Sequence, residues 1–462
     1  MDTDNQHLSY EDLVKNSKRF FRDNKGAKVQ TSANLIENLS SYSETIETFA
    51  NKAYPVIHES MLPLIMDFLN YKRDHGSSIE QDLYKDMSVV QFIDRLISKR
   101  PLAFLTPADS WLAKSGEYGA GGWGEIGTEE EGETYEVLKL EDFMSYDEVK
   151  VAAMLQLSSP VVTINNGSRD NIGEPGENFL TTGVYVGAVG ARFDKAGRME
   201  YQDMLVTKDQ NTEENGYGEN NERPSLNKVF AKFYGMKNFH EFNDVKKHEH
   251  LYEESQKYLR KGRFLNKEIY TKRIQLSAET FLLEAEHRGI SEDRDIYCHV
   301  VGLGLGVWQI HKDQNKFFLQ AWVRALQQLK LTRVKTINFS WIASSPDVPE
   351  LVDKTQFEGI NILFSRRNPF DPLPHTEKPP LVVAMFAWDG NSYVGNEYWQ
   401  GHLSASGDPA AAACSTIPEL MNPDINSANI RGENTRVATR SRGLVTLSEA
   451  LRLVQVRDND TL

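Results

Sequence analysis

The chain is poor in cysteine, in long apolar runs and in basic charge. Only two of its 462 residues are cysteines, Cys298 and Cys414, so no disulfide framework is implied. No apolar run reaches the length that a membrane-spanning helix needs. The first residues also lack the basic and apolar pattern of a signal peptide. We therefore expect a soluble, cytoplasmic protein.

The shortage of basic residues limits the classes of partner that the protein can bind. The formal net charge is −14, which argues against broad binding to nucleic acid or to an anionic membrane, since both require a basic surface. Hydrophobic residues make up 40% of the chain, enough for a sizeable core. Because 462 residues exceed one typical domain, we predict a helical accessory region at residues 1–110 and a main domain at residues 111–462.

A glycine loop between two apolar runs is the most informative pattern. Residues 296–301 are apolar, glycines follow at 302, 304 and 306, and residues 334–339 form a second apolar run. Between them Phe318, Trp322 and Leu326 recur at helical spacing. A strand, glycine loop, helix and strand predict an α/β fold in which backbone N–H groups approach a phosphate. Tight packing alone is the alternative explanation for the glycines.

Several familiar motifs are missing. The dinucleotide fingerprint is incomplete, because position 307 is Val and the following strand ends without an acidic residue. The phosphate-loop motif G-x-x-x-x-G-K-[ST] and the hydrolase motif G-x-S-x-G do not occur. The run from Lys247 to His250 lacks the H-E-x-x-H spacing of zinc sites. Dehydrogenases and phosphate-loop NTPases are therefore disfavoured, and neither a metal nor a cofactor is expected.

Residues 381–420 hold the densest group of polar and aromatic side chains. An apolar run leads into a loop in which carboxylates could bind ribose or activate water, and aromatic rings could stack on a ligand. The candidate site residues here are Asp389, Asn391, Asn396, Glu397, Trp399 and Asp408. Asp408 followed by Pro409 is also an ordinary helix start.

Two further segments carry candidate side chains. Asn165 and Asn166 follow a β-rich run, at a strand end where open α/β sheets bind ligands, although an Asn-Gly turn is the simpler explanation. Arg192 could meet a phosphate, or it could belong to a buried arginine pair. Glu200 and Asp203 are expected to be surface acids.

These motifs together resemble a known family. VVGLGLGVWQ, followed by a helix and TINFSW, is similar to the diphosphate loop of macrodomains. FAWDGNSYVGNEYW, SASGDPAAAACSTIPELMNP, INNGSRDNIG and VGARF resemble the MavL-like macrodomain group. Its members are arginine-specific ADP-ribosylhydrolases, distantly similar to poly(ADP-ribose) glycohydrolase. The resemblance spans residues 150–425.

The resemblance implies a fold and a site. The fold would be a macrodomain-like mixed sheet between helices, and the activity would be removal of ADP-ribose from modified arginine, including on ubiquitin. Asp389, Glu397 and Asp408 match the family's acidic site residues, and the glycine loop matches its diphosphate loop. The residues of that loop expected to bind the ligand are Gly302, Leu303, Gly304, Leu305, Gly306, Val307 and Trp308.

Some alternatives stay open at this point. The Asn165–Asn166 segment is either the family's amide loop, or the order of motifs is permuted. A reader that binds ADP-ribose without cleaving it, or an interaction scaffold, would also fit the sequence. Every enzymatic expectation requires that residues 302–306 and 389–408, remote in sequence, form one cleft.

Overall fold

The computed structural model describes residues 7–255, 262–352, 356–403 and 408–459. A ten-stranded sheet is its centre, with the strand order β12-β13-β11-β10-β14-β6-β5-β1-β15-β16. In that order the strands are Gln356–Phe357, Ile360–Ser365, Val334–Ser340, Ile296–Val300, Leu381–Ala387, Thr182–Ala188, Gln156–Val162, Tyr54–His58, Arg436–Thr439 and Gly443–Thr446.

The sheet is mixed, and the direction of each strand decides at which end of the sheet the loop after it lies. Strands β13, β11, β10, β14 and β6 run parallel to one another, whereas β5 is antiparallel to β6 and to β1. Parallel strands joined through helices are typical of α/β domains. The predicted α/β class with a mixed sheet is confirmed.

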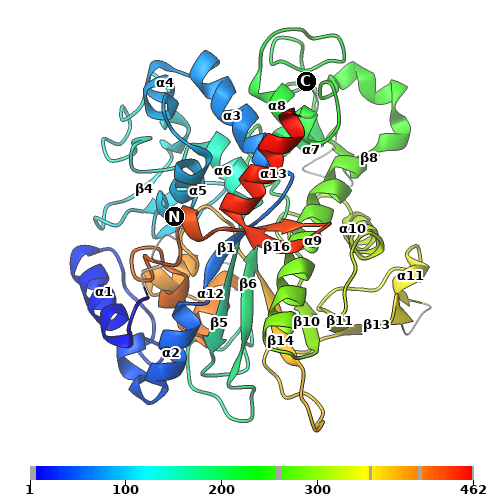
Figure 1. Cartoon of the computed structure of the whole chain (residues 1–462). Helices are drawn as coiled ribbons and strands as arrows, with labels where there is room; N and C mark the ends of the chain where they lie inside the picture. Colours follow the sequence, from blue (N-terminus) through cyan, green and yellow to red (C-terminus); the bar gives the residue numbers. More distant parts are fainter. Residues whose placement is uncertain (1–6, 256–261, 353–355, 404–407, 460–462) are drawn as a thin grey trace.

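Helices cover the sheet in the arrangement of Figure 1. The long helix α9 (Lys267–Ser291) lies in front of the sheet beside α10 (Gln314–Gln328), and α1 (Tyr10–Asp23) to α5 lie along the left side. The other helices are α2 (Ser43–Ala50), α3 (Met61–His75), α4 (Ser78–Tyr84), α5 (Val89–Ser98), α6 (Tyr146–Ala152), α7 (Tyr201–Met204), α8 (Leu226–Phe233), α11 (Pro349–Val352), α12 (Asp408–Ser415) and α13 (Leu447–Asn459).

Alternation along the strands separates the two faces. Ser158 of β5 pairs with Val186 of β6, and its hydroxyl donates to Glu284 of α9 at 2.5 Å, so this face carries α9. Tyr185, one residue earlier in β6, points to the opposite face, where it contacts Phe370 and Phe386. Helix α12 packs on this second face, where its two ends influence the pKa of the Tyr185 phenol: the charge of Asp408 raises this pKa and Ser415 lowers it.

The strand–loop–helix–strand prediction for residues 296–340 is confirmed as β10, α10 and β11. Phe318, Trp322 and Leu326 of α10 are buried. The first hundred residues are mainly helical, but they also contribute β1 to the sheet, which the sequence analysis did not anticipate. The domain boundary at residue 110 stays a prediction.

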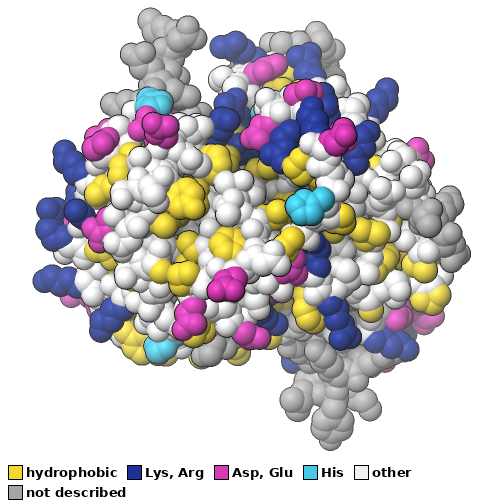
Figure 2. All heavy atoms as spheres, turned by 90° about the horizontal axis from the view of Figure 1, so that it is seen from below, with side chains coloured by type: hydrophobic (Ala, Val, Ile, Leu, Met, Phe, Trp, Pro, Cys, Tyr) yellow, Lys and Arg dark blue, Asp and Glu magenta, His cyan; other side chains and the backbone are white. Residues whose placement is uncertain are grey.

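Two smaller sheets complete the described structure. They contain β2 (Ala103–Leu105), β3 (Ser110–Leu112) and β4 (Tyr118–Ala120), and β7 (Leu205–Val206), β9 (Phe264–Asn266) and β8 (Tyr252–Glu254). Among the described helices, none combines the length and the apolar character required to span a bilayer. Side chains of both charges are interspersed on the face seen from below in Figure 2.

Candidate active site

Three loops meet at the carboxyl ends of three neighbouring strands in the middle of the sheet. They follow β10, β14 and β6, which are neighbours and run in the same direction. The first is the glycine loop at residues 301–313, the second is the acidic loop at residues 388–397, and the third is the short segment 189–194. Carboxyl ends of adjacent parallel strands are where open α/β sheets bind ligands.

Two glycines let these loops touch. A β-carbon on Gly190 would lie 2.5 Å from the backbone nitrogen of Gly304, and one on Gly390 would lie 2.9 Å from Val189. The segment after β6 therefore contacts both the glycine loop and the acidic loop. The structure thus brings residues 302–306 and the start of 389–408 together, whereas residues 404–407 lie outside the described residues.

The glycine loop offers its backbone to solvent. Gly306 is exposed and Val307 is 81% exposed, whereas Leu303 is buried and anchors the loop to the core. Leu305 and Trp308 are partly buried, and the Trp308 side chain partly opposes the rise that burial causes in the pKa of Asp194, in the neighbouring segment. Hydrogen bonds among the described residues do not engage the N–H groups of Gly304, Gly306 and Val307. Such N–H groups are what a diphosphate requires.

Asp389 is the first carboxylate after β14 and belongs to the acidic loop itself. The Asn396 side-chain amide donates to its Oδ2 at 2.6 Å, and the backbone N–H of Asn391 lies 3.4 Å from its Oδ1. Burial, followed by the negative charge of Glu397, raises the pKa of Asp389 to about 7. Asp389 can therefore take up or release a proton near neutral pH, as a catalytic acid or base must.

Glu397 and Asn396 are held by an unusual turn. They begin the short 3₁₀ helix Asn396–Gln400, and both side chains are fully buried. Gly395 has φ +111° and Asn396 has φ +32°, so the chain passes through the left-handed region at two successive residues. The Asn396 side chain also accepts the backbone N–H of Phe104 at 2.9 Å, which ties the turn to β2.

Two buried arginines support the acidic loop. Arg192 donates to the carbonyl of Asp389 at 2.8 Å and to the side chain of Asn391. It also pairs with Glu200 at 3.2 Å, so it positions the loop and is not free to meet a phosphate. Arg100 donates to the carbonyl of Gly390, and burial lowers the pKa of its guanidinium to about 9. The supporting role of Arg100 could not be predicted from the sequence, because no recognisable motif surrounds this residue.

Glu200 and Asp203 are not surface acids. Both are at most 5% exposed, and Lys150 neutralises Asp203 through a direct ion pair. Burial nevertheless raises the pKa of Asp203 to about 7. Their local sequence looked polar, but Asp203 pairs with Lys150 of α6, and Glu200 pairs with Arg273 of α9 in addition to Arg192. Lys150 and Arg273 lie far away along the chain.

Trp399 occupies a different environment from the one expected. Its ring is fully buried, packs edge-on against Phe20 of α1 with centroids 5.4 Å apart, and donates from Nε1 to the carbonyl of Val394 at 2.7 Å. In this conformation the ring presents no surface on which a ligand could stack.

Asn165 and Asn166 lie at the opposite end of the central strands from the acidic loop. The reason is that β5 is antiparallel to β6, so the end of β5 lies beside the start of β6. The Asn165 amide donates to the carbonyl of Glu174 at 3.1 Å, and that of Asn166 to Asp371 at 2.7 Å. Asn165 therefore stabilises its own loop, whereas Asn166 connects that loop to the one that carries Asp371. The expected contact of both side chains with a ligand stays a prediction.

Asp408 starts α12 on the second face of the sheet. It lies 3.7 Å from Arg169, and burial raises the pKa of its carboxyl, opposed by the Arg169 charge. A β-carbon on Gly395 would lie 3.2 Å from Ala413, so α12 packs against the turn that carries Glu397. One helix therefore contacts both the acidic loop and, through Arg169, the Asn165 segment.

Comparison with known proteins places this arrangement in a family. The sequence model of the MavL-like ADP-ribosylhydrolases matches residues 12–452. The chain is 38% identical over 432 residues to ADP-ribosylarginine hydrolase CG3568 of Drosophila melanogaster, covering 89% of this chain and 82% of that protein. It is 32% identical over 429 residues to ADP-ribosylarginine hydrolase CG2909 of the same species, covering 89% and 83%.

The chain belongs to the MavL-like ADP-ribosylhydrolase family. The family match begins at residue 12 and so includes the helices that precede β1. The predicted resemblance is confirmed, and it extends well beyond residues 150–425.

One cluster in this family member has the composition of a metal site. Glu219, His240 and His248 place their ligand atoms within 4.8 Å of one another. The two imidazole rings are stacked, with centroids 4.3 Å apart and planes only 11° apart. A ring nitrogen binds an ion that lies in the plane of its ring. Because the planes of these two rings are nearly parallel and stacked, one ion cannot lie in both of them. The cluster as it stands therefore does not fit a shared ion.

Proposed function

We propose that this chain hydrolyses the N-glycosidic bond that joins ADP-ribose to arginine side chains of proteins. The observation that carries the proposal is the position of Asp389 beside the glycine loop, at the ends of the neighbouring strands β14 and β10. Family membership and the names of both Drosophila relatives support it. The macrodomain character of the fold is part of the same proposal.

The chemistry follows from the geometry. The backbone N–H groups around Gly304 and Gly306 would hold the diphosphate and leave the second ribose at the acidic loop. Breaking the bond between C1 of that ribose and the guanidine nitrogen passes through an oxocarbenium-like state, which a nearby carboxylate stabilises. Water supplies the hydroxyl at C1, and its proton goes to a carboxylate.

We assign the proton transfer to Asp389. A pKa of about 7 lets it accept the proton from water at neutral pH and pass it on to the departing guanidine. Glu397 contributes negative charge next to Asp389, and it would stabilise the cationic transition state. Asp408 would contact the ligand from α12 and position Arg169.

The test is release of free ADP-ribose from a protein modified on arginine, with a serine-linked substrate alongside. Asp389→Asn and Glu397→Gln should lower turnover at least about 100-fold, and the melting temperature should not fall below that of the wild type. Asp86→Asn, which changes an exposed carboxylate, is the matched control. Binding of ADP-ribose without turnover by the wild type would identify a reader and refute the hydrolase.

Ubiquitin is the target that the family resemblance suggests. ADP-ribosylated ubiquitin and a second arginine-modified protein, compared at equal concentration, would test it. A kcat/KM at least tenfold higher for ubiquitin supports this target, and equal values contradict a preference.

A further inference from the structure

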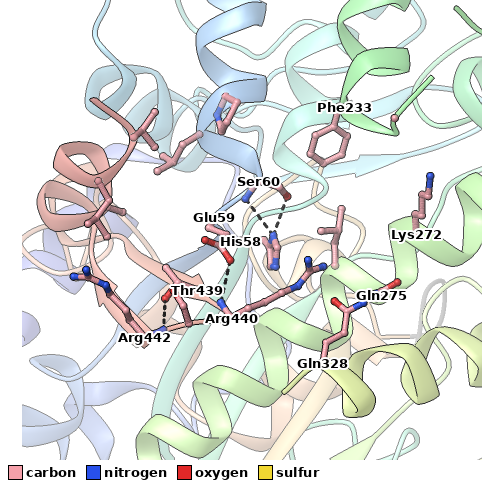
Figure 3. Close-up of a pocket in the computed structure, with 18 of the residues that line it drawn as sticks. His58, Glu59, Ser60, Phe233, Lys272, Gln275, Gln328, Thr439, Arg440 and Arg442 are labelled. Atoms are coloured by element: carbon pink, nitrogen blue, oxygen red, sulfur yellow. Dashed lines mark hydrogen bonds between the residues drawn. The ribbon is translucent and has the colours of Figure 1, made fainter. Parts of the chain in front are cut away.

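A large cavity lies away from the acidic loop and the glycine loop. Its volume is about 1000 Å³, at the upper end of small-molecule sites. Helices α3, α8, α9 and α13 and the turn between β15 and β16 form its walls, as Figure 3 shows. None of the residues assigned above to hydrolysis lines it.

The lining is basic, although the protein is acidic overall. Lys272, Arg440 and Arg442 line the cavity, and Glu59 is the one carboxylate among the described lining residues. Lys272 donates to the neutral carbonyl of Tyr234 at 2.8 Å, and its charge also acts on Glu268 one turn earlier in α9, although the two form no ion pair among the described residues. In a chain with a net charge of −14, three cations around one cavity indicate an anionic ligand.

The floor of the cavity is a built polar network. Glu279 of α9 is fully buried and accepts from His58 Nε2 at 2.9 Å, from Gln275 at 2.7 Å and from Arg440 Nε at 2.7 Å. Burial opposes ionisation of Glu279, but the hydrogen bonds from His58 and Arg440 outweigh it and lower its pKa. The network fixes the Arg440 guanidinium against Glu279. Arg442 forms only a long, exposed ion pair with Glu449 at 3.8 Å, and exposed pairs of this kind contribute little, so Arg442 and Lys272 can still neutralise a ligand.

The start of α3 adds to the positive potential. Ser60 precedes this 15-residue helix, but its hydroxyl bonds to His58 Nδ1 at 2.8 Å instead of capping the helix. No acidic residue lies in the first turn, and Leu62 and Pro63 of that turn line the cavity. The positive end of the helix dipole therefore borders the cavity without a capping side chain.

The opposite wall is apolar. Phe233, Leu276 and Leu453 line it, and Figure 3 shows the Phe233 ring above Ser60, His58 and Arg440. A ligand that satisfies both walls carries a phosphate at one end and a flat or apolar group at the other. We propose that this cavity is a second ligand site, which binds an organic phosphate of nucleotide size.

The experiment titrates AMP into the full-length protein by calorimetry. In Lys272→Glu/Arg442→Glu, AMP stoichiometry should fall by one equivalent, or affinity at one site should fall at least tenfold. Lys15→Glu/Lys330→Glu, which changes net charge equally at exposed positions, should bind AMP like the wild type. Melting temperatures check that each variant is folded.

A second variant tests the cavity without changing charge. Gln328 is exposed at its edge, and Gln328→Trp should fill part of the space and weaken AMP binding as well. Inorganic phosphate should compete with AMP at this site. Identical AMP isotherms in the wild type and both cavity variants would overturn the proposal. So would binding of a polyglutamate peptide in place of AMP, since it would assign the cavity to a protein partner.

Discussion

Gly190 is the position at which a single methyl group should separate the two halves of the active site. A β-carbon there would lie 2.5 Å from Gly304 N and from the carbonyl carbon of Leu303. Both are backbone atoms and cannot rotate away. Ordinary contact begins near 3.4 Å, so the loops must part by about 0.9 Å, the difference between 3.4 and 2.5 Å.

The expected effect of Gly190→Ala is a loss of function larger than the loss of stability. Overpacking of this kind costs about 1–3 kcal/mol of unfolding free energy. The segment 189–194 also contacts the acidic loop at Gly390, so pushing the glycine loop about 1 Å away from this segment moves it relative to the acidic loop. This displacement should lower kcat/KM about 100-fold, since reacting groups must be held within a fraction of an ångström.

The assay measures hydrolysis of an arginine-ADP-ribosylated protein, with calorimetry of free ADP-ribose and chemical denaturation on the same preparations. Gly124→Ala is the control, because the nearest atom to its β-carbon would be the Arg198 side chain at 3.6 Å. A Gly190→Ala enzyme with wild-type kcat/KM and wild-type ADP-ribose affinity would refute the idea that these two loops form one site.

Three other predictions concern single side chains. Because burial raises the pKa of Asp389 to about 7 from 3.8, the folded state holds a proton that the unfolded state releases, so this residue makes stability fall as pH rises from about 4 to about 7. Asp389→Asn should therefore melt higher than the wild type at pH 8 while activity is lost; a lower melting temperature at pH 8 would contradict the assignment. Asn396→Ala should cost about 1–3 kcal/mol in urea denaturation, because it leaves the N–H of Phe104 and the carboxylate of Asp389 without their amide partner. Trp399→Phe should lower the melting temperature, through lost packing on Phe20, and leave KM unchanged, whereas a raised KM would return Trp399 to the binding site.

Much of the fold around the site could be predicted because local pattern and global structure agree there. The glycine loop follows a buried strand and precedes a helix whose apolar residues recur at helical spacing, and this produces β10, α10 and β11. The acidic loop follows another buried strand, β14. The enzymatic expectation required these two loops to be adjacent. The pairing of Ile296 in β10 with Leu381 in β14 makes the strands that precede the loops neighbours.

The remainder depends on information that no local segment contains. Strand direction decides that Asn165 lies at the opposite end of the central strands from Asp389, and the sequence of β5 does not encode direction. Trp399 resembled a ligand-stacking residue because acids surround it, but its partner Phe20 lies 379 positions earlier in the chain. Arg100 is equally remote from the loop that it supports.

The pairing of β1 with β15 has a consequence for how the chain is made. Val56 lies opposite Arg436, so 380 positions (436 minus 56) separate two adjacent strands. At roughly 5–20 residues per second, a ribosome needs about 20–80 s to synthesise the stretch between them. During that interval one edge of β1 is unpaired and open to association with other nascent chains. Folding in the cell should therefore depend on chaperones that shield this edge until translation reaches the last strands.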